Sequence, residues 1–275
     1  DEIRLQAEIA KLFPDREKVG SRDQCLAVAN SVDRRFSVIT GGPGTGKTTT
    51  VARLLALHLT QHLEAGKNPS ELRILLMAPT GKAAQRLNES LSHATQQLKV
   101  DARVHEALSQ VSAGTIHRLL GWTPLPPERG GPFRHRSEMP LEADIVLVDE
   151  ASMVDLALMC RLFDAISMSA QVILIGDRNQ LASVEAGGVL SDLCGKLAGD
   201  TIDRLSEERR KLISLRTGLM GAVESPDTTL QKSTDTPAKM KKAPRRKKKV
   251  HPQQLALSFD DNWDSSDDSS KLVVK

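Results

Sequence analysis

Residues 41–48 read Gly-Gly-Pro-Gly-Thr-Gly-Lys-Thr, and this stretch decides the fold that the sequence predicts. It fits the pattern G-x-x-x-x-G-K-[ST], whose glycines allow successive backbone N–H groups to turn toward one anion. A β-prone run at residues 36–40 precedes the loop, and apolar residues at helical spacing follow it over residues 48–63. Because these are the flanking elements that the motif requires, we favour a phosphate-binding P-loop over a glycine-rich turn that precedes a lysine by chance.

The residue types of this loop match the chemistry of a nucleoside triphosphate and its metal. Lys47 is expected to neutralise the β- and γ-phosphate oxygens, and the Thr48 hydroxyl is placed to bind Mg²⁺. The helix that follows adds the positive end of its dipole. The sequence therefore predicts ATP and Mg²⁺ as cofactors. The predicted nucleotide contacts in the loop are Gly42, Pro43, Gly44, Thr45, Gly46, Lys47, Thr48 and Thr49.

An acidic pair, Asp149 and Glu150, ends the apolar run at residues 144–148. We expect Asp149 to bind the metal together with Thr48, and Glu150 to orient or deprotonate the attacking water. The alternative is an acidic pair that caps the helix after the strand. The P-loop upstream favours the metal site.

The segment Gly176-Asp177-Arg178-Asn179-Gln180 follows a further apolar run at residues 171–175. In a parallel sheet, ligands bind beyond the carboxyl ends of the strands. This position would bring the Gln180 amide near the γ-phosphate, where we expect it to act in catalysis with Lys47 and Glu150. An ordinary polar loop stays open as the alternative, because this short segment does not exclude it.

Apolar runs alternate with helical segments along most of the chain. The predicted strands are the runs at residues 36–40, 73–78, 144–148 and 171–175. The predicted helices lie within residues 1–35 and at residues 48–63 and 82–98. Continuous apolar strands between helices are typical of a parallel sheet covered on both faces, so the predicted fold class is α/β, a doubly wound parallel sheet with the P-loop between its first strand and the following helix. Residues 121–140, rich in Pro, Gly, Arg and His, are expected to form an exposed loop.

The chain has 275 residues with 39% hydrophobic content, enough to bury a core, and a formal net charge of +3. Residues 225–275 carry 11 Lys and Arg against 7 Asp and Glu, a net of +4, which leaves −1 for residues 1–224. A nucleic-acid site in the globular part must therefore be a local groove. The polar segment 221–275 cannot bury enough apolar surface to fold alone, and we expect it to be disordered.

Two parts of this tail carry binding signals. Residues 240–249 form a basic cluster that can hold a DNA backbone without sequence preference, although a solvated charge run is an equal alternative. Gln254, Leu255, Leu257 and Phe259 resemble the Q-L-x-L-x-F peptide by which bacterial proteins dock on the replicative sliding clamp. An incidental apolar patch is favoured over clamp docking.

The three cysteines, Cys25, Cys160 and Cys194, are far apart and lack metal-ligand spacing. They predict reduced, buried thiols in a cytosolic protein. The chain begins without an initiating Met or a signal-like apolar block, so we expect it to begin inside a longer protein. No run of eighteen apolar residues occurs, and we expect no membrane span.

Further segments complete a set of motifs. Residues 78–84 read Ala-Pro-Thr-Gly-Lys-Ala-Ala, and residues 115–120 read Thr-Ile-His-Arg-Leu-Leu. With Gln24, the P-loop region, residues 148–153 and residues 176–187, they occur in the order of the motifs of the RecD-like family of superfamily 1 DNA helicases, which they resemble. The resemblance covers residues 22–220.

The resemblance implies a RecA-like first motor domain at residues 36–220, after a helical lead-in, residues 1–35, in which Gln24 contacts adenine. It implies an ATP hydrolase and DNA helicase subunit that couples ATP hydrolysis to 5′-to-3′ translocation on single-stranded DNA in double-strand break processing and recombination. RecB- and RecC-like subunits are the implied partners, in the bacterial cytoplasm. Thr80, Lys82 and His117 would contact the DNA. For His117 alone, a histidine satisfied behind a helix start is the alternative.

The sequence departs from the family beyond residue 220, where motifs IV, V and VI of a second motor domain are expected and are not found. Arginines of that domain stabilise charge on the γ-phosphate, so the isolated chain is expected to be poorly active. Two hypotheses stay open. The chain is either a motor subunit or fragment whose second half is supplied elsewhere, or a non-motor ATP- and DNA-binding module, which clamp docking would make an adaptor.

Overall fold

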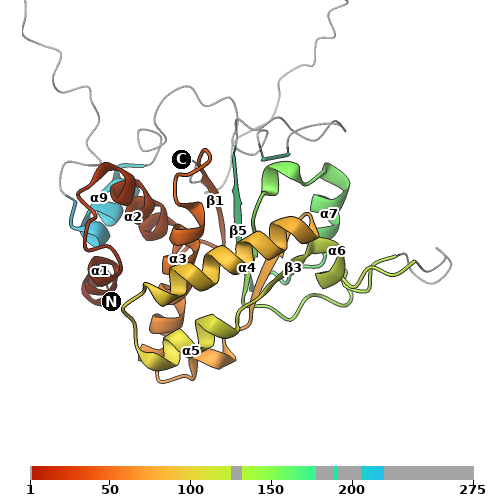
Figure 1. Cartoon of the computed structure of the whole chain (residues 1–275), viewed down its shortest axis with the longest axis horizontal. Coiled ribbons are helices and arrows are strands. Elements are labelled where there is room, and N and C mark those ends of the chain that lie inside the picture. The colour runs from red at the N-terminus through yellow and green to blue at the C-terminus, as the bar shows by residue number, and fades with distance from the viewer. Residues whose placement is uncertain (1, 125–131, 178–188, 191–205, 220–275) are drawn as a thin grey trace, which may run out of the picture. The chain divides into compact units, whose positions relative to one another are not determined.

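Buried apolar runs form the strands of one parallel sheet (Figure 1). The computed structural model describes residues 2–124, 132–177, 189–190 and 206–219, which all belong to one compact unit. Within these residues the strands are β1 (Phe36–Thr40), β2 (Ile74–Ala78), β3 (Ala113–Thr115), β4 (Ile145–Val148) and β5 (Gln171–Gly176). Their order in the sheet is β1-β5-β4-β2-β3, and each neighbouring pair is parallel.

Helices cover both faces of the sheet because its strands are apolar on both sides. The described α-helices are α1 (Glu2–Leu12), α2 (Val19–Ser31), α3 (Lys47–Glu64), α4 (Gly81–Gln96), α5 (Ala102–Gln110), α6 (Ile116–Leu119), α7 (Leu156–Asp164) and α9 (Glu207–Thr217), and short 3-10 helices lie at η1 (Pro69–Glu71) and η3 (Ala151–Met153). One core joins alternate strand side chains to α1 through α5. The other core joins the remaining strand side chains to α6 and α7. This arrangement leaves the carboxyl ends of the strands for a site.

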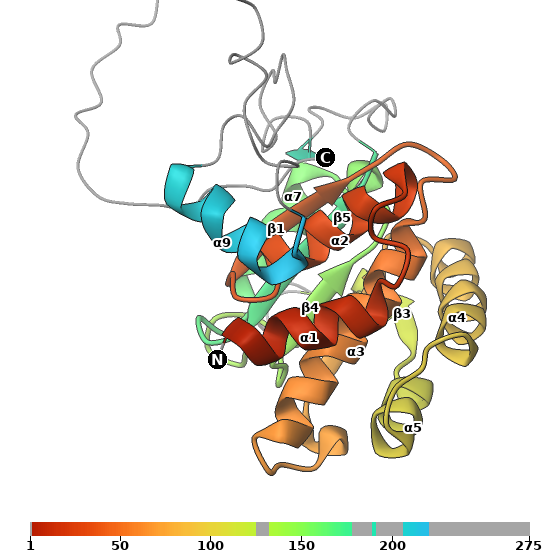
Figure 2. The same ribbon diagram turned by 90° about the vertical axis from the view of Figure 1, so that its left-hand side faces the viewer.

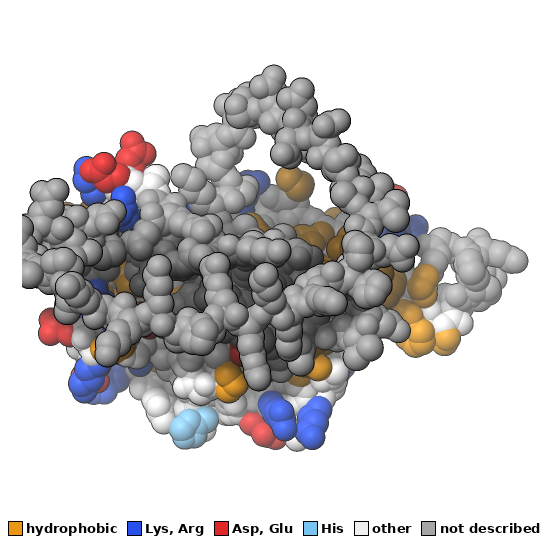
Figure 3. Space-filling model, turned by 90° about the horizontal axis from the view of Figure 1, so that it is seen from above, with side chains coloured by type: hydrophobic (Ala, Val, Ile, Leu, Met, Phe, Trp, Pro, Cys, Tyr) orange, Lys and Arg blue, Asp and Glu red, His pale blue; other side chains and the backbone are white. Residues whose placement is uncertain are grey.

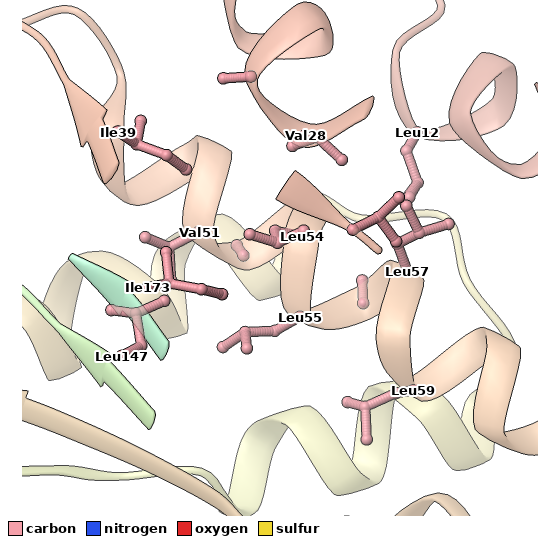
Figure 4. Packing of buried hydrophobic residues seen from close by; sticks show 14 of the residues in the cluster. Leu12, Val28, Ile39, Val51, Leu54, Leu55, Leu57, Leu59, Leu147 and Ile173 are labelled. Atoms are coloured by element: carbon pink, nitrogen blue, oxygen red, sulfur yellow. The ribbon is translucent and has the colours of Figure 1, made fainter. Parts of the chain in front are cut away.

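The helix α3 lies at the centre of the larger core. Figure 4 shows Val51 near the start of α3 beside Ile39 of β1 and Ile173 of β5, whereas Leu57 further along faces Leu12 of α1. All five side chains are buried. The packing fixes the position of the first turn of α3 relative to the carboxyl end of β1.

The helix α9 contacts α1 and α2, far from it in sequence (Figure 2). The buried Arg216 side chain donates to both carboxylate oxygens of Glu2 at 2.8 Å and to Asp33 at 3.1 Å. Arg209 donates to both oxygens of Asp33, at 2.8 and 2.7 Å. These bidentate arginine–carboxylate contacts fix geometry. Arg209 also donates to Oδ1 of Asn30 in α2 at 2.7 Å, so α9 is tied to the helix that carries Gln24.

The four predicted strands and the α/β class are confirmed. The predicted helices at residues 48–63 and 82–98 correspond to α3 and α4, and the helical segment 1–35 contains α1 and α2. The sequence patterns do not predict β3, because three residues are too few to show a strand period. It joins the sheet by pairing with β2.

The prediction of buried cysteines is confirmed for Cys25 and wrong for Cys160, which lies on the exposed side of α7. Burial raises the pKa of the Cys25 thiol to about 12, so it stays protonated. The predictions for Cys194, for Gln180 and for the tail at 221–275, with its basic cluster and clamp-like peptide, lie outside the described residues. Of the helices that the structure describes, none has the length and apolar character needed to cross a membrane.

Candidate functional site

The glycine-rich loop joins the carboxyl end of β1 to the start of α3. Gly44 and Gly46 have φ angles of 74° and 78°, a left-handed conformation that glycine adopts without strain. The N–H of Gly41 donates to the carbonyl of Gly176 at 3.1 Å, which ties the loop to the end of β5. The loop therefore has the backbone conformation that lets N–H groups converge on an anion.

Lys47, the first residue of α3, is held by this loop. Its Nζ donates to the carbonyls of Gly41 at 2.8 Å and Gly42 at 3.1 Å. Thr45 closes the turn, with its hydroxyl donating to the carbonyl of Gly42 at 2.9 Å. The ammonium thus contacts two neutral acceptors, which a phosphate can replace with a stronger, charge-assisted hydrogen bond.

A cavity of about 660 Å³ lies beside the loop, a volume typical of small-molecule sites. Asp149 and Glu150, which follow β4, lie on its surface. The predicted site residues that line it are Pro43, Gly44, Thr45, Gly46, Lys47, Thr48, Thr49, Asp149 and Glu150. Gly42 is not among the lining residues, although its carbonyl contacts Lys47. The fold therefore brings the P-loop and the acidic pair to one cavity.

Burial raises the pKa of the Asp149 carboxyl, and the charge of Glu150 adds to this effect, whereas a backbone hydrogen bond of Glu150 and the charge of Lys47 oppose it. A nearby cation would favour the ionised carboxylate. Glu150 stands at the N-cap position of the short 3-10 helix Ala151–Met153, but its side chain makes no capping hydrogen bond there. The later helix α7 is capped by Asp155, which accepts from the N–H of Leu158 at 2.8 Å. The helix-capping alternative is therefore disfavoured.

Residues of α4 form another wall of the cavity, which the sequence does not predict. They are Glu89, Ser90, His93 and Ala94, together with Gln97 just after the helix. Polar residues at helical spacing predict only a solvent-facing side. The side faces the P-loop because α4 crosses α3, as Figure 1 shows.

Gln24 contacts the P-loop from α2 and is not among the residues that line the cavity. Its Nε2 donates to the carbonyl of Thr45 at 3.1 Å, and a side chain at Gly46 would overlap the amide. Its Oε1 accepts from Nη1 of Arg53 at 3.1 Å, and the Arg53 guanidinium lies 4.4 Å from the centroid of the Phe13 ring. No motif marks Arg53 or Phe13, so sequence analysis misses both.

The predicted DNA contacts lie at one edge of the sheet. The strands β2 and β3 are neighbours, with Ala78 opposite Thr115. Thr80 and His117 each lie two residues beyond these partners, and Lys82 is in the first turn of α4; all three are exposed. The Thr80 hydroxyl caps α4 by accepting a backbone N–H at 3.2 Å. An exposed helix start beside a lysine suits a phosphate group.

His117 belongs to an aromatic cluster that the sequence does not single out. Its ring centroid lies 6.5 Å from that of Trp122, edge to face, and 5.9 Å from that of Phe133. The Trp122 side chain is 48% exposed. Figure 3 shows exposed hydrophobic side chains at the end of this domain where Figure 1 places α6. An exposed histidine against two rings favours a surface contact over a histidine satisfied behind a helix start.

The residues around the cavity fit a nucleoside triphosphate and Mg²⁺. Thr48 supplies a hydroxyl and Asp149 a carboxylate, and such oxygen donors are the ligands that Mg²⁺ prefers. A Cβ placed on Gly44 would meet no described atom within 4 Å, so the loop faces open space. Lys47 supplies positive charge for the phosphates.

Comparison with known proteins identifies the domain. A family model described as an AAA domain (AAA_19) matches residues 24–186, which is more than half of the chain. The chain belongs to the AAA domain family. The matched region of this AAA domain begins at Gln24 and contains the P-loop and the acidic pair. Membership in this family implies that it binds a nucleotide.

The AAA domain is RecD-like in sequence. It is 44% identical over 203 residues to the RecBCD enzyme subunit RecD of Mycolicibacterium smegmatis, covering 74% of this chain and 35% of that protein. It is 43% identical over 197 residues to the RecBCD enzyme subunit RecD of Haemophilus influenzae, covering 70% of this chain and 29% of that protein. It is 38% identical over 175 residues to the ATP-dependent RecD2 DNA helicase of Deinococcus radiodurans, covering 63% of this chain and 20% of that protein. The chain therefore spans about a third or less of the length of these relatives.

A solved structure of unliganded Pif1 from Bacteroides sp. is 22% identical to the AAA domain chain. The match covers 61% of this chain and 33% of the Pif1 chain, with a TM-score of 0.30.

Proposed function

We propose that this AAA domain is the first motor domain of a RecD-like DNA helicase subunit. It would couple ATP hydrolysis to translocation on single-stranded DNA during double-strand break processing and recombination. The observation that carries the proposal is the cavity shared by Lys47, Thr48, Asp149 and Glu150. The names of the relatives, RecBCD enzyme subunit RecD and RecD2 DNA helicase, support the same function.

In this proposal the residues of the cavity divide the work of hydrolysis. Lys47 leaves the carbonyls of the loop and neutralises phosphate charge, and Thr48 and Asp149 hold Mg²⁺. The bound metal supplies further neutralisation of the phosphate oxygens. Glu150 orients the attacking water and accepts its proton. Gln180 contacts the γ-phosphate, which stays a prediction from the sequence.

The proposed DNA surface is the sheet edge that carries Thr80, Lys82 and His117. Lys82 and the exposed first turn of α4 would contact phosphates, whereas His117 and Trp122 would stack on bases. The contact between the His117 and Trp122 rings supports this arrangement, because unpaired bases bind to exposed ring faces whatever their sequence.

RecB- and RecC-like subunits are the proposed partners, in the cytoplasm of a bacterium. The proposed domain division is a lead-in at residues 1–35, the motor domain at 36–220 and a tail at 221–275. The arginines that stabilise charge on the γ-phosphate would come from a second motor domain, whose motifs the sequence does not contain.

Replacing Lys47 with Ala tests the nucleotide site. We expect Mg-ATP to raise the melting temperature of the wild-type chain and to leave that of Lys47→Ala unchanged, because the variant loses the phosphate cation. Melting without nucleotide is the control for folding. Equal ATP binding by Lys47→Ala and the wild type would refute the assignment of this cavity.

ATP turnover with single-stranded DNA separates the motor from the non-motor hypothesis. A motor subunit should hydrolyse ATP slowly alone and much faster once RecB- and RecC-like partners and single-stranded DNA are present. A non-motor binding module should bind ATP and single-stranded DNA but hydrolyse ATP slowly under every condition. Vigorous strand separation by the isolated chain would contradict the dependence on a second motor domain.

Replacing Trp122 with Ala tests the stacking surface. We expect the variant to lose about 1–3 kcal/mol of binding free energy for single-stranded oligothymidine, since one stacked base contributes about this much. Met168→Ala is the control, because Met168 is an exposed hydrophobic residue outside the aromatic cluster. Trp263→Phe leaves Trp122 as the sole tryptophan, and its fluorescence should be quenched by the oligonucleotide. Binding by Trp122→Ala at wild-type strength would remove Trp122 from the DNA surface.

Sliding-clamp docking by Gln254, Leu255, Leu257 and Phe259 rests on the sequence pattern only. Replacing Leu257 and Phe259 together with Ala should abolish clamp binding if the peptide is the docking site. No loss of binding would retire the idea.

A further inference from the structure

The side-chain amide of Gln24 joins α2 to the P-loop and to α3. Its Nε2 donates to the carbonyl of Thr45, and its Oε1 accepts from Arg53, both at 3.1 Å. These bonds use one hydrogen of the amide nitrogen and one lone pair of the oxygen, which leaves one donor and one acceptor. Gln24 is half-buried, so this remaining pair can meet a ligand beside the P-loop.

The two partners allow only one orientation of this amide. The guanidinium of Arg53 can only donate, and the carbonyl of Thr45 can only accept. A flipped amide would place its NH₂ group against the guanidinium and its oxygen against the carbonyl. Both contacts would be repulsive, so Arg53 and Thr45 together fix which end of Gln24 faces which way.

Arg53 is itself held in place. Its guanidinium lies 4.4 Å from the centroid of the Phe13 ring, and Phe13 is fully buried. The Nε atom of Arg53 is buried without a hydrogen-bond partner among the described residues, which costs free energy. An apolar side chain would cover Phe13 without this cost, so the cost indicates that the guanidinium has a role beyond packing.

We propose that Arg53 is a positioning residue that, through Gln24, makes this site prefer adenine to guanine nucleotides. The inference rests on the proposed function, in which Gln24 faces the base. One edge of adenine presents the N6 amino donor and the N7 acceptor, whereas guanine presents O6 and N7, both acceptors. The remaining donor and acceptor of Gln24 match adenine. Guanine would place its O6 against Oε1.

The test measures binding of the β,γ-imido analogues of ATP and GTP with Mg²⁺ by calorimetry on the full chain, without turnover. The wild type should prefer the adenine analogue by a factor on the order of ten or more. Arg53→Met removes the donor to Oε1, leaves only the Thr45 carbonyl to orient Gln24 and should lower this preference by about tenfold. Arg53→Lys keeps a donor and should retain most of the preference.

A double-variant comparison separates positioning from packing. Gln24→Ala should lose the base preference, and Arg53→Met in that background should change it no further. If Arg53 serves only in packing, Arg53→Met will weaken both analogues by the same factor, and the unchanged ratio overturns the inference. Melting curves show whether each variant folds. If Arg53→Met does not fold, the inference requires that Arg53→Lys keeps and Gln24→Ala loses the preference.

Binding of the two analogues separates the role of Arg53 from the proposed ATP site. A wild-type chain that binds neither analogue would refute both. A chain that binds the adenine analogue but shows the same ratio in wild type and Arg53→Met would refute the role of Arg53 alone. Equal affinity of the wild-type chain for the two analogues would also overturn the role of Arg53 in base preference.

Discussion

Glu150 combines a left-handed backbone with a place in the cavity. Its φ is 51° and its ψ is 38°, and it is the sole non-glycine residue of the described ranges with a positive φ. Such a conformation costs about 1 kcal/mol or more for a residue with a side chain. Strain retained beside the P-loop is consistent with a functional carboxylate, because glycine would relieve it.

Replacing Glu150 with Gly is expected to leave the free energy of unfolding unchanged or to raise it by up to about 1 kcal/mol, since glycine adopts this conformation without strain. ATP hydrolysis should fall by about 10²–10⁴-fold because the general base is lost. Urea unfolding checks the first effect, and steady-state ATP turnover with single-stranded DNA and RecB- and RecC-like partners checks the second.

Glu150→Gln is the matched control, because it keeps the strained backbone and the size of the side chain. It should unfold like the wild type and hydrolyse ATP as poorly as Glu150→Gly. Full turnover by Glu150→Gln would assign Glu150 a structural role.

At the scale of the element, α3 connects the phosphate site to the core. Its first residue, Lys47, contacts the loop, and Val51, Leu54 and Leu55 are buried in the core. His58 continues this helix. Burial lowers the pKa of the His58 imidazole to about 4, and its Nε2 atom is buried without a hydrogen-bond partner in the described part of the chain.

The unfolded chain protonates His58 near pH 6.5, whereas the folded chain does so near pH 4. Between these values the unfolded state binds more protons, so the stability contribution of neutral His58 is lost as the pH falls from 6.5 toward 4. His58→Phe should remove this part of the pH dependence, which is at most about 1.4 kcal/mol per pH unit. Urea unfolding at pH 7.5, 5.5 and 4.5 measures it.

The control for His58→Phe is His93→Gln, because His93 is exposed on α4. It should leave the slope of stability against pH nearly unchanged. A wild-type slope in His58→Phe would show that the imidazole is not the group that titrates.

Elements differ in how far the sequence predicts them. The strands β1, β4 and β5 are continuous apolar runs, which short-range patterns reveal. By contrast, β3 exists because it pairs with β2, and Glu89 and His93 reach the cavity because α4 crosses α3. Those contacts join residues that are distant in sequence, so no local pattern contains them.

At the scale of the whole molecule, α9 holds the first helices of the chain. Burial alone would raise the pKa of the Asp33 carboxyl, but hydrogen bonds from Arg209 and Arg216 outweigh it and hold that pKa well below its usual range. Hydrogen bonding to Arg216 lowers the pKa of Glu2 as well. The contacts of Asp33 and Glu2 with the arginines stabilise the fold at pH values above the unfolded pKa of the two carboxyls. This stabilisation is lost as the pH falls below those pKa values.

Replacing Arg216 with Ala should destabilise the fold by about 2 kcal/mol, because it removes a buried guanidinium that bonds both oxygens of Glu2 and leaves Asp33 with Arg209 alone. Urea or thermal unfolding measures the change. Lys211→Ala on the same helix is the control, since its ion pair with Glu207 is exposed to solvent on both sides and adds little to stability. Equal effects of the two variants would contradict a structural role for the buried network.

The sequence by itself determined the P-loop, the acidic pair, the main strands and the α/β class. Each of these depends on residue types at short, fixed spacing, where backbone geometry and local chemistry leave little freedom. The tertiary structure decided that α4 lines the cavity, that Arg53 and Phe13 stand behind Gln24, and that α9 closes onto α1 and α2. Those features arise because burial of apolar surface brings distant segments together, and only the folded chain shows which side chains then meet.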